Sequence, residues 1–305
     1  MLAIVAPGQG AQVPGMLHAW LELPGVADQL NALSAASGLD LVAHGTTSDA
    51  DTIRDTAVAQ PLIVAAGLIS WNALNAPAAD VVAGHSVGEI TAAVVSGVLT
   101  PAQAMGFVQL RGAGMAQAAA NVATGMSAVL GGEASVVVTK AVEHGLTPAN
   151  MNGAGQIVVA GTLEQLDAFA NDAPEGGRVR PLPVAGAFHT SHMAPAVAAL
   201  ETYAASMSTA DPVAVLLSNA DGNSINGGAE ALRRLVAQVS NPVRWDLCMD
   251  MMVSMGVTGL VELSPGGTLG GLAKRAMPGV AAVAVKNPED LDAARALIAE
   301  HVGKD

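Results

Sequence analysis

The chain has 305 residues, of which 51% are apolar and only 13% charged, and its formal net charge is −13. This composition predicts a globular α/β enzyme and excludes a disordered chain, while the negative charge and the 2% aromatic content argue against a nucleic acid or an anionic membrane as a partner. Cys248 is the only cysteine and no cationic segment precedes the apolar N-terminal stretch, so we expect a cytoplasmic protein without an intrachain disulfide.

Short apolar segments alternate with helical ones along most of the chain. The strands expected are Leu2–Ala6, Val81–Ala83, Val213–Ser218, Gly259–Leu263 and Ala281–Val285. The helices expected are Pro61–Leu74, Pro101–Ala120, Met193–Ala205, Ala229–Val239, Asp246–Met255 and Glu289–His301. This alternation predicts a large α/β-hydrolase-like domain whose mostly parallel sheet is covered on both faces. The long uncharged segments Ala57–Ala79 and Ile90–Leu110 contain prolines and polar residues, which favours core helices over membrane spans.

The middle of the chain has a different order of elements. Its expected elements are, in turn, strand Met126–Leu130, helix Ala134–His144, strand Pro148–Asn152, strand Gln156–Ala160, helix Leu163–Asn171 and strand Arg178–Val184. The order β-α-β-β-α-β is that of a ferredoxin-like unit. We therefore expect a small ferredoxin-like domain of residues 125–187, inserted into a large α/β domain formed by residues 1–124 and 188–305.

A glycine-rich segment, Pro7-Gly8-Gln9-Gly10-Ala11-Gln12, follows the first strand. It begins like a dinucleotide-binding fingerprint, but the third glycine would fall at Val13, which argues against such a site. A strand end of this kind exposes backbone N–H groups, and the N–H of Gln9 is a candidate donor to an oxyanion.

The segment Gly84-His85-Ser86-Val87-Gly88-Glu89 lies between an apolar strand and a helical stretch. This is the local pattern of a nucleophile elbow, in which glycines permit a sharp turn that presents the serine hydroxyl at the strand end. The free N–H groups at the start of the following helix stabilise negative charge. Ser86 is therefore the predicted nucleophile of an acyl-enzyme.

A serine nucleophile needs a base within hydrogen-bonding distance. Of the seven histidines, His189 and His192 follow the last strand of the expected small domain, at the boundary between domains, where clefts form. His189 is the first choice and His192 the alternative.

Arg111 is the only charged residue between Glu89 and Glu133. Because a buried, unpaired guanidinium is costly, we expect an anionic group to meet it. One interpretation is an ion pair with a distant acidic residue, or a side chain that extends to solvent. The other is a site for a substrate carboxylate, which a guanidinium binds through two parallel hydrogen bonds.

Taken together, these motifs resemble those of the malonyl-CoA:acyl-carrier-protein transacylases, the acyltransferase family shared by fatty acid and polyketide synthesis. The resemblance extends over nearly the whole chain. It rests on Gly8-Gln9-Gly10, the elbow at Ser86, Gln109-Leu110-Arg111-Gly112, Asn152 to Gly161, Phe188-His189, Asn241-Pro242-Val243-Arg244-Trp245 and Glu262-Leu263-Ser264-Pro265-Gly266.

The resemblance implies Ser86 as nucleophile, His189 as base, the backbone N–H groups of Gln9 and Val87 as oxyanion hole, and Arg111 as the residue that binds the substrate carboxylate. It implies that a main-chain carbonyl orients the histidine; we expect that carbonyl in the stretch Asn241 to Arg244, with Asn241 as the first choice.

Phe188 matches members of the family that select malonyl over methylmalonyl groups. Those members often carry a histidine two residues before the phenylalanine, where this chain has Gly186.

The implied reaction transfers a malonyl group from coenzyme A to the phosphopantetheine thiol of acyl carrier protein, through a malonyl-serine intermediate, for fatty acid synthesis. The substrate is malonyl-CoA, and no bound cofactor and no metal are expected. One alternative is a serine esterase or thioesterase, whose late histidine would have to be His301. The others are an acyltransferase that serves a polyketide synthase and a non-catalytic scaffold that binds carrier proteins.

Overall fold

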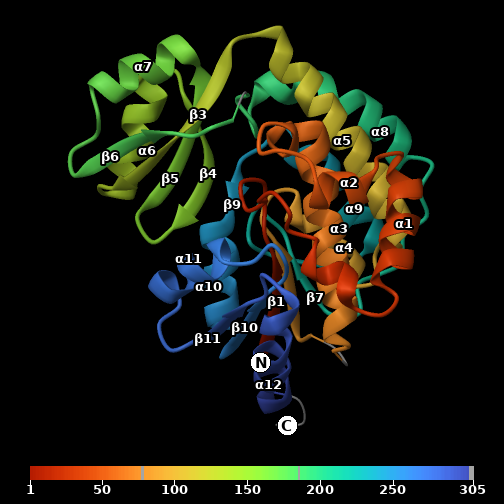
Figure 1. The fold of residues 1–305 in the computed structure, drawn as a ribbon. Helices are drawn as coiled ribbons and strands as arrows, with labels where there is room; N and C mark the ends of the chain where they lie inside the picture. The colour runs from red at the N-terminus through yellow and green to blue at the C-terminus, as the bar shows by residue number, and fades with distance from the viewer. Residues whose placement is uncertain (77–78, 185, 302–305) are drawn as a thin grey trace.

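A computed structural model describes residues 1–76, 79–184 and 186–301, and within them the chain forms an α/β fold with two sheets (Figure 1). The larger sheet has the strand order β11-β10-β1-β2-β7-β8. Its strands are β1 (Leu2–Ala6), β2 (Val81–Gly84), β7 (Val215–Leu217), β8 (Ser224–Ile225), β10 (Gly259–Glu262) and β11 (Ala281–Ala284). All neighbours pair in parallel except β7 and β8, so the expectation of a mostly parallel sheet is confirmed.

Helices cover both faces of this sheet. They are α1 (Val26–Ser37), α2 (Leu41–Thr46), α3 (Thr56–Leu74), α4 (Gly88–Val95), α5 (Pro101–Asn121), α8 (Val197–Ala204), α9 (Gly228–Gln238), α10 (Trp245–Ser254), α11 (Thr268–Ala276) and α12 (Leu291–His301), with short 3-10 turns at Ala19–Glu22, Thr52–Arg54, Ser191–Ala196 and Pro288–Asp290. Successive side chains of a strand point to opposite faces. Ile4 of β1 accordingly packs in the core formed with α3 and α5, and Val5 in the core formed with α10 and α11.

Helix α3 lies in the core of this body. It is the only helix in the described part of the chain that is long and apolar enough to cross a membrane, but 72% of its most apolar window is buried against other elements. The expectation of a core helix there is confirmed. The helix begins at Thr56 rather than at Pro61, because the Asp55 side chain accepts a hydrogen bond from the Ala57 N–H and caps the helix one turn earlier.

The smaller sheet lies to one side of the larger body, in green in Figure 1. Its elements are β3 (Thr124–Gly131), α6 (Ala134–Glu143), β4 (Thr147–Gly153), β5 (Gln156–Thr162), α7 (Leu163–Asn171) and β6 (Gly177–Pro181), which is the expected order. The sheet order is β6-β3-β5-β4-β9, and all pairs are antiparallel except β4 with β9.

Two details of this sheet differ from expectation. Strand β6 ends at Pro181 rather than at Val184, because the Val184 N–H donates to the carbonyl oxygen of Leu182 at 2.8 Å, in a tight local turn, instead of to strand β3. The two-residue strand β9 (Val243–Arg244), which comes from the later part of the chain, pairs with β4 and ties the small sheet to the larger body.

Candidate active site

Ser86 lies at the turn between β2 and α4, with a left-handed backbone conformation (φ 54°). Glycines on either side let α4 pack against the sheet: a Cβ at Gly84 would lie 2.0 Å from the carbonyl carbon of Gly88, and one at Gly88 would lie 2.2 Å from the carbonyl oxygen of Ala6. The Ser86 N–H donates to Oδ1 of Asn219 at 2.8 Å, which holds the turn. The predicted elbow is therefore present in its local geometry.

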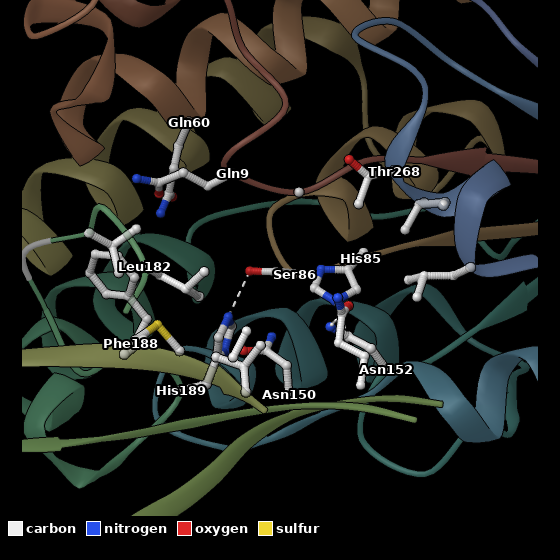
Figure 2. Close-up of a pocket in the computed structure, with 18 of the residues that line it drawn as sticks. Gln9, Gln60, His85, Ser86, Asn150, Asn152, Leu182, Phe188, His189 and Thr268 are labelled. Atoms are coloured by element: carbon white, nitrogen blue, oxygen red, sulfur yellow. Dashed lines mark hydrogen bonds between the residues drawn. The ribbon is translucent and has the colours of Figure 1, made fainter. Parts of the chain in front are cut away.

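The Ser86 hydroxyl and the His189 ring form a hydrogen bond (Figure 2), with 2.7 Å between Oγ and Nε2. On the other side of the ring, Nδ1 lies 2.9 Å from the backbone carbonyl oxygen of Gln238. Because a carbonyl only accepts, Nδ1 carries the proton and Nε2 is left free to accept one from the serine. His192, the alternative base, does not line the cavity at Ser86.

The expectation that Asn241 supplies the orienting carbonyl is wrong. Gln238 is the last residue of α9, where the final carbonyl groups of a helix have no partner within the helix and remain available to His189. The carbonyl of Asn241 has only a lesser influence on the pKa of His189.

His189 is only 3% exposed. Burial lowers the pKa of its ring to about 3, and the positive charge of Arg111 contributes in the same direction. The ring is therefore neutral near pH 7, which is the state that a general base needs.

Arg111, on α5, is 1% exposed and its guanidinium lies beside the nucleophile. Nη1 donates to Oε1 of Gln60 at 2.6 Å, Nη2 donates to Oε1 of Gln238 at 2.7 Å, and Nη2 also lies 3.5 Å from Oγ of Ser86. Among the described residues no carboxylate is within salt-bridge distance of it. The side chain neither reaches solvent nor forms an ion pair. The interpretations of Arg111 as the partner of a distant acidic residue and as a side chain that extends to solvent are therefore both wrong. Burial lowers its pKa to about 10, so it remains charged at neutral pH.

The cavity above Ser86 has a volume of about 210 Å³ and lies between the two sheets (Figure 2). The larger body contributes Gly8, Gln9, Gln60, His85, Ser86, Met115, Phe188, His189, Thr268, Leu269 and Leu272. The small sheet and the segment after it contribute Met126, Ala128, Asn150, Asn152, Gln156, Val158, Leu182 and Val184. His85 points away from the nucleophile, with Nε2 2.8 Å from Oδ1 of Asn152. Within residues 1–76, 79–184 and 186–301, no group of His, Cys, Asp or Glu is arranged to hold a metal ion.

Residues 4–287 match the acyl transferase domain family. The chain belongs to this family. The malonyl CoA-acyl carrier protein transacylase of Mycobacterium tuberculosis H37Rv is 52% identical over 297 residues, which are 96% of this chain and 98% of the relative. That of Escherichia coli K12 is 33% identical over 303 residues, which are 96% of this chain and 98% of the relative. The resemblance inferred from the motifs is confirmed.

Solved structures give the same result. The crystal structure of MCAT from Mycobacterium tuberculosis has a TM-score of 0.93 at 51% identity and covers 96% of this chain and 99% of its own. A complex described as a type II PKS acyl-carrier protein with its malonyl-transacylase, PlMCAT:AntF, has a TM-score of 0.90 at 30% identity and covers 97% of this chain and 99% of its own.

Two backbone N–H groups of this acyltransferase remain available beside the nucleophile. Gln9 follows β1 and Val87 is the N-cap residue of α4, and neither N–H donates to a backbone carbonyl of the described residues. The Gln9 side chain donates to Oγ1 of Thr56 at 3.2 Å, which fixes the glycine-rich segment in place. The positions of Gln9 and Val87 around Ser86 suit donors to an oxyanion.

Four buried polar residues of the acyltransferase site, Gln60, Glu89, Asn219 and Gln238, have no role in the sequence-based prediction. Gln60 carries a signal, because it is one of only two amide side chains in the apolar helix α3, and so does Glu89, which completes the elbow motif. Asn219 and Gln238 carry none, since they lie in a loop and at the end of an amphipathic helix. The sequence-based prediction also does not include the residues of α11 that line the cavity, Thr268, Leu269 and Leu272.

Proposed function

We propose that the chain transfers a malonyl group from malonyl-CoA to the phosphopantetheine thiol of acyl carrier protein, through a malonyl ester of Ser86. The observation that carries the proposal is the position of the Arg111 guanidinium, 3.5 Å from the oxygen of a serine that is hydrogen-bonded to a neutral histidine. A nucleophile beside a buried cation suits an acyl group with a free carboxylate. The names of the relatives, malonyl CoA-acyl carrier protein transacylases, support the same reaction.

In the first half-reaction, Oγ of Ser86 attacks the thioester carbon while Nε2 of His189 accepts the hydroxyl proton. The N–H groups of Gln9 and Val87 stabilise the oxyanion of the tetrahedral intermediate. The carbon–sulfur bond then breaks, and His189 returns the proton to the departing thiolate of coenzyme A. The product is a malonyl ester of Ser86, whose carboxylate is bound by Arg111.

In the second half-reaction, the thiol of the carrier's phosphopantetheine arm takes the place of coenzyme A in the cavity. His189 accepts the thiol proton as the sulfur attacks the ester carbon, and it returns that proton to Oγ of Ser86 when the ester bond breaks. Free enzyme is regenerated with no net change in protons. The backbone carbonyl of Gln238 keeps the His189 ring in the tautomer that both half-reactions need.

We assign selection between acyl groups to Phe188, which is 6% exposed and lines the cavity beside Ser86. A Cβ at Gly186 would lie 2.8 Å from the Phe188 ring, so the glycine leaves that ring room that a larger residue would take. The ring limits space beside the malonyl methylene, which disfavours a methyl branch.

For the fold, we propose a large α/β-hydrolase-like domain of residues 1–124 and 188–305 and an inserted ferredoxin-like domain of residues 125–187. The elbow at the end of a central parallel strand supports the first assignment. The sheet order β6-β3-β5-β4, which follows the chain order β3, α6, β4, β5, α7, β6, supports the second. Pairing of β9 with β4 belongs to the contact between the two domains.

The proposed partners are acyl carrier protein and the coenzyme A thioester, with no bound cofactor and a cytoplasmic location. Carrier proteins are generally acidic and so is this chain, so docking needs a local basic surface. Lys274 and Arg275 are exposed in the last turn of α11, whose first turns line the cavity, and Arg233 is exposed on α9. We propose that the carrier contacts basic residues of this later part of the chain.

The test is an intact-mass measurement after brief exposure to malonyl-CoA, with peptide mapping of the adduct. We expect one malonyl group on Ser86 and none on the Ser86→Ala variant, and transfer to holo carrier protein when it is added. Rapid release of malonate to water with the carrier present would indicate an esterase instead. A wild-type protein that forms no adduct and transfers no malonyl group would refute the proposal.

A further inference from the structure

Glu89 is buried behind the catalytic residues and does not line the cavity. It lies in the first turn of α4, three residues after Ser86. Both of its carboxylate oxygens accept hydrogen bonds: Oε1 from the backbone N–H of Asn219 at 2.6 Å and Oε2 from the side-chain amide of Gln238. Because burying a charge is costly, we expect the Glu89 carboxylate to have a role at this position behind the nucleophile.

The two hydrogen-bond partners of Glu89, Asn219 and Gln238, also bind residues of the catalytic site. The Asn219 side chain accepts from the Ser86 N–H at 2.8 Å. Gln238 acts twice: its backbone carbonyl accepts from His189, and its side-chain Oε1 accepts from Nη2 of Arg111 at 2.7 Å. The Glu89 carboxylate is therefore linked, through Asn219 or Gln238, to the nucleophile Ser86, the base His189 and the cation Arg111.

The orientation of the Gln238 side-chain amide depends on these contacts. Its Nε2 faces three acceptors: Oε2 of Glu89, the backbone oxygen of Ser86 at 3.1 Å and Oδ1 of Asn219 at 3.3 Å. Of these three only the carboxylate is charged, and hydrogen bonds to charged groups are the stronger ones. In the reversed orientation the amide oxygen would face the carboxylate and the amide NH₂ group would face the guanidinium. The carboxylate thus keeps the amide oxygen directed at Arg111.

We propose that Glu89 is a positioning residue that acts through Gln238: its negative charge fixes the amide that holds the Arg111 guanidinium ready for a malonyl carboxylate. This inference rests on the proposed function. It separates two substrates, because malonyl transfer uses the guanidinium and acetyl transfer does not. A fault in the positioning of Arg111 therefore lowers malonyl transfer selectively.

The charged and titratable groups that face Glu89 are Arg111 on α5, Arg234 on α9 and the Cys248 thiol on α10. Burial raises the pKa of Glu89 to about 7, against the opposing influence of the Asn219 N–H, of Arg111, of the hydrogen bond from Gln238 and of Arg234. As the pH falls through 7, Glu89 takes up a proton and loses the charge that orients Gln238. The ratio of malonyl to acetyl transfer is therefore expected to fall with it.

The experiment compares kcat/KM for malonyl-CoA and acetyl-CoA in wild type and Glu89→Gln at pH values on both sides of 7. An amide offers a single acceptor oxygen, so either Asn219 or Gln238 would face an NH₂ group in the variant. We expect the malonyl-to-acetyl ratio of wild type to fall on acidification with a midpoint near 7, and that of the variant to be about tenfold lower and independent of pH.

Two further variants separate positioning from general damage. Glu262→Gln alters another fully buried carboxylate, which accepts from the N–H groups of Gly267, Leu269 and Gly270, and we expect it to leave the malonyl-to-acetyl ratio unchanged. Gln238→Met keeps the backbone carbonyl that orients His189 but removes the amide. It should reproduce the selective loss even if Glu89→Gln does not fold, and combining the two substitutions should add little.

Equal losses for malonyl and acetyl transfer in Glu89→Gln or Gln238→Met would overturn the inference, and so would a wild-type ratio that is flat through pH 7. These outcomes are distinct from failure of the proposed function, because wild type would still form the malonyl ester of Ser86. Wild-type protein without that ester refutes the reaction itself.

Discussion

Replacing Arg111 with methionine is expected to convert the enzyme from a malonyl-selective to an unselective acyltransferase. Methionine fills a similar volume without charge, so the buried site keeps its packing. In the wild-type chain the Arg111 guanidinium donates to two neutral amide oxygens, those of Gln60 and Gln238, at 2.6 and 2.7 Å. A malonyl carboxylate in the variant would enter a buried site without a cation.

The magnitude follows from the burial of Arg111, which is 1% exposed. Removing one partner of a buried charge pair costs about 3–5 kcal/mol, and about 1.4 kcal/mol corresponds to a factor of ten. The kcat/KM for malonyl-CoA is therefore expected to fall by between about 100-fold and 5,000-fold relative to that for acetyl-CoA. Acetyl transfer reports any general damage, such as the loss of donors to the two amides.

The assay measures transfer of radiolabelled malonyl and acetyl groups to holo carrier protein, with kcat/KM determined for each substrate. Arg295→Met is a control for the loss of an arginine outside the site, since Arg295 lies on α12, where its guanidinium donates to the carbonyl oxygen of Ala73 at 2.7 Å and pairs with Asp292. We expect that control to leave the ratio unchanged. Equal losses for the two substrates in Arg111→Met would refute the assignment of Arg111 to the malonyl carboxylate.

Two further predictions test packing and electrostatics. Gly88→Ala should lower the free energy of unfolding by about 2 kcal/mol or more, because the added Cβ would lie 2.2 Å from the carbonyl oxygen of Ala6. Gly271→Ala is the matched control, because its Cβ has no neighbouring atom within 4 Å. We expect it to stabilise α11 by about 0.5–1 kcal/mol. Similar shifts in the thermal denaturation temperature of the two variants would contradict the packing argument. The pKa of His189 is about 3, against an ordinary value of 6.5. Between these pH values the folded chain binds fewer protons than the unfolded chain. The free energy of unfolding is therefore expected to decrease as the pH falls below 6.5. Arg111→Met should raise that pKa by removing a positive charge, and an NMR titration of the ring nitrogens that finds it unchanged or lower would count against this electrostatic effect.

The features that the sequence alone determined are those with short-range causes. Thr100 and Pro101 predict the start of a helix, and α5 begins at Pro101 with a capping box at Thr100. The glycines around Ser86 predict the elbow because only residues without a Cβ fit where α4 meets the first two strands. The order of strands and helices in the small sheet is readable for the same reason, since apolar periodicity and turn residues are local properties.

Contacts between distant parts of the chain were decided only by the tertiary structure. Pairing of Ser86 with His189 joins residues 103 positions apart, and the choice of Gln238 over Asn241 depends on where α9 ends against that histidine. Gln60 and Gln238 come from different helices, yet both accept from Arg111. No local pattern records which buried donor meets which acceptor, because that pairing is set by how the helices pack around the sheet.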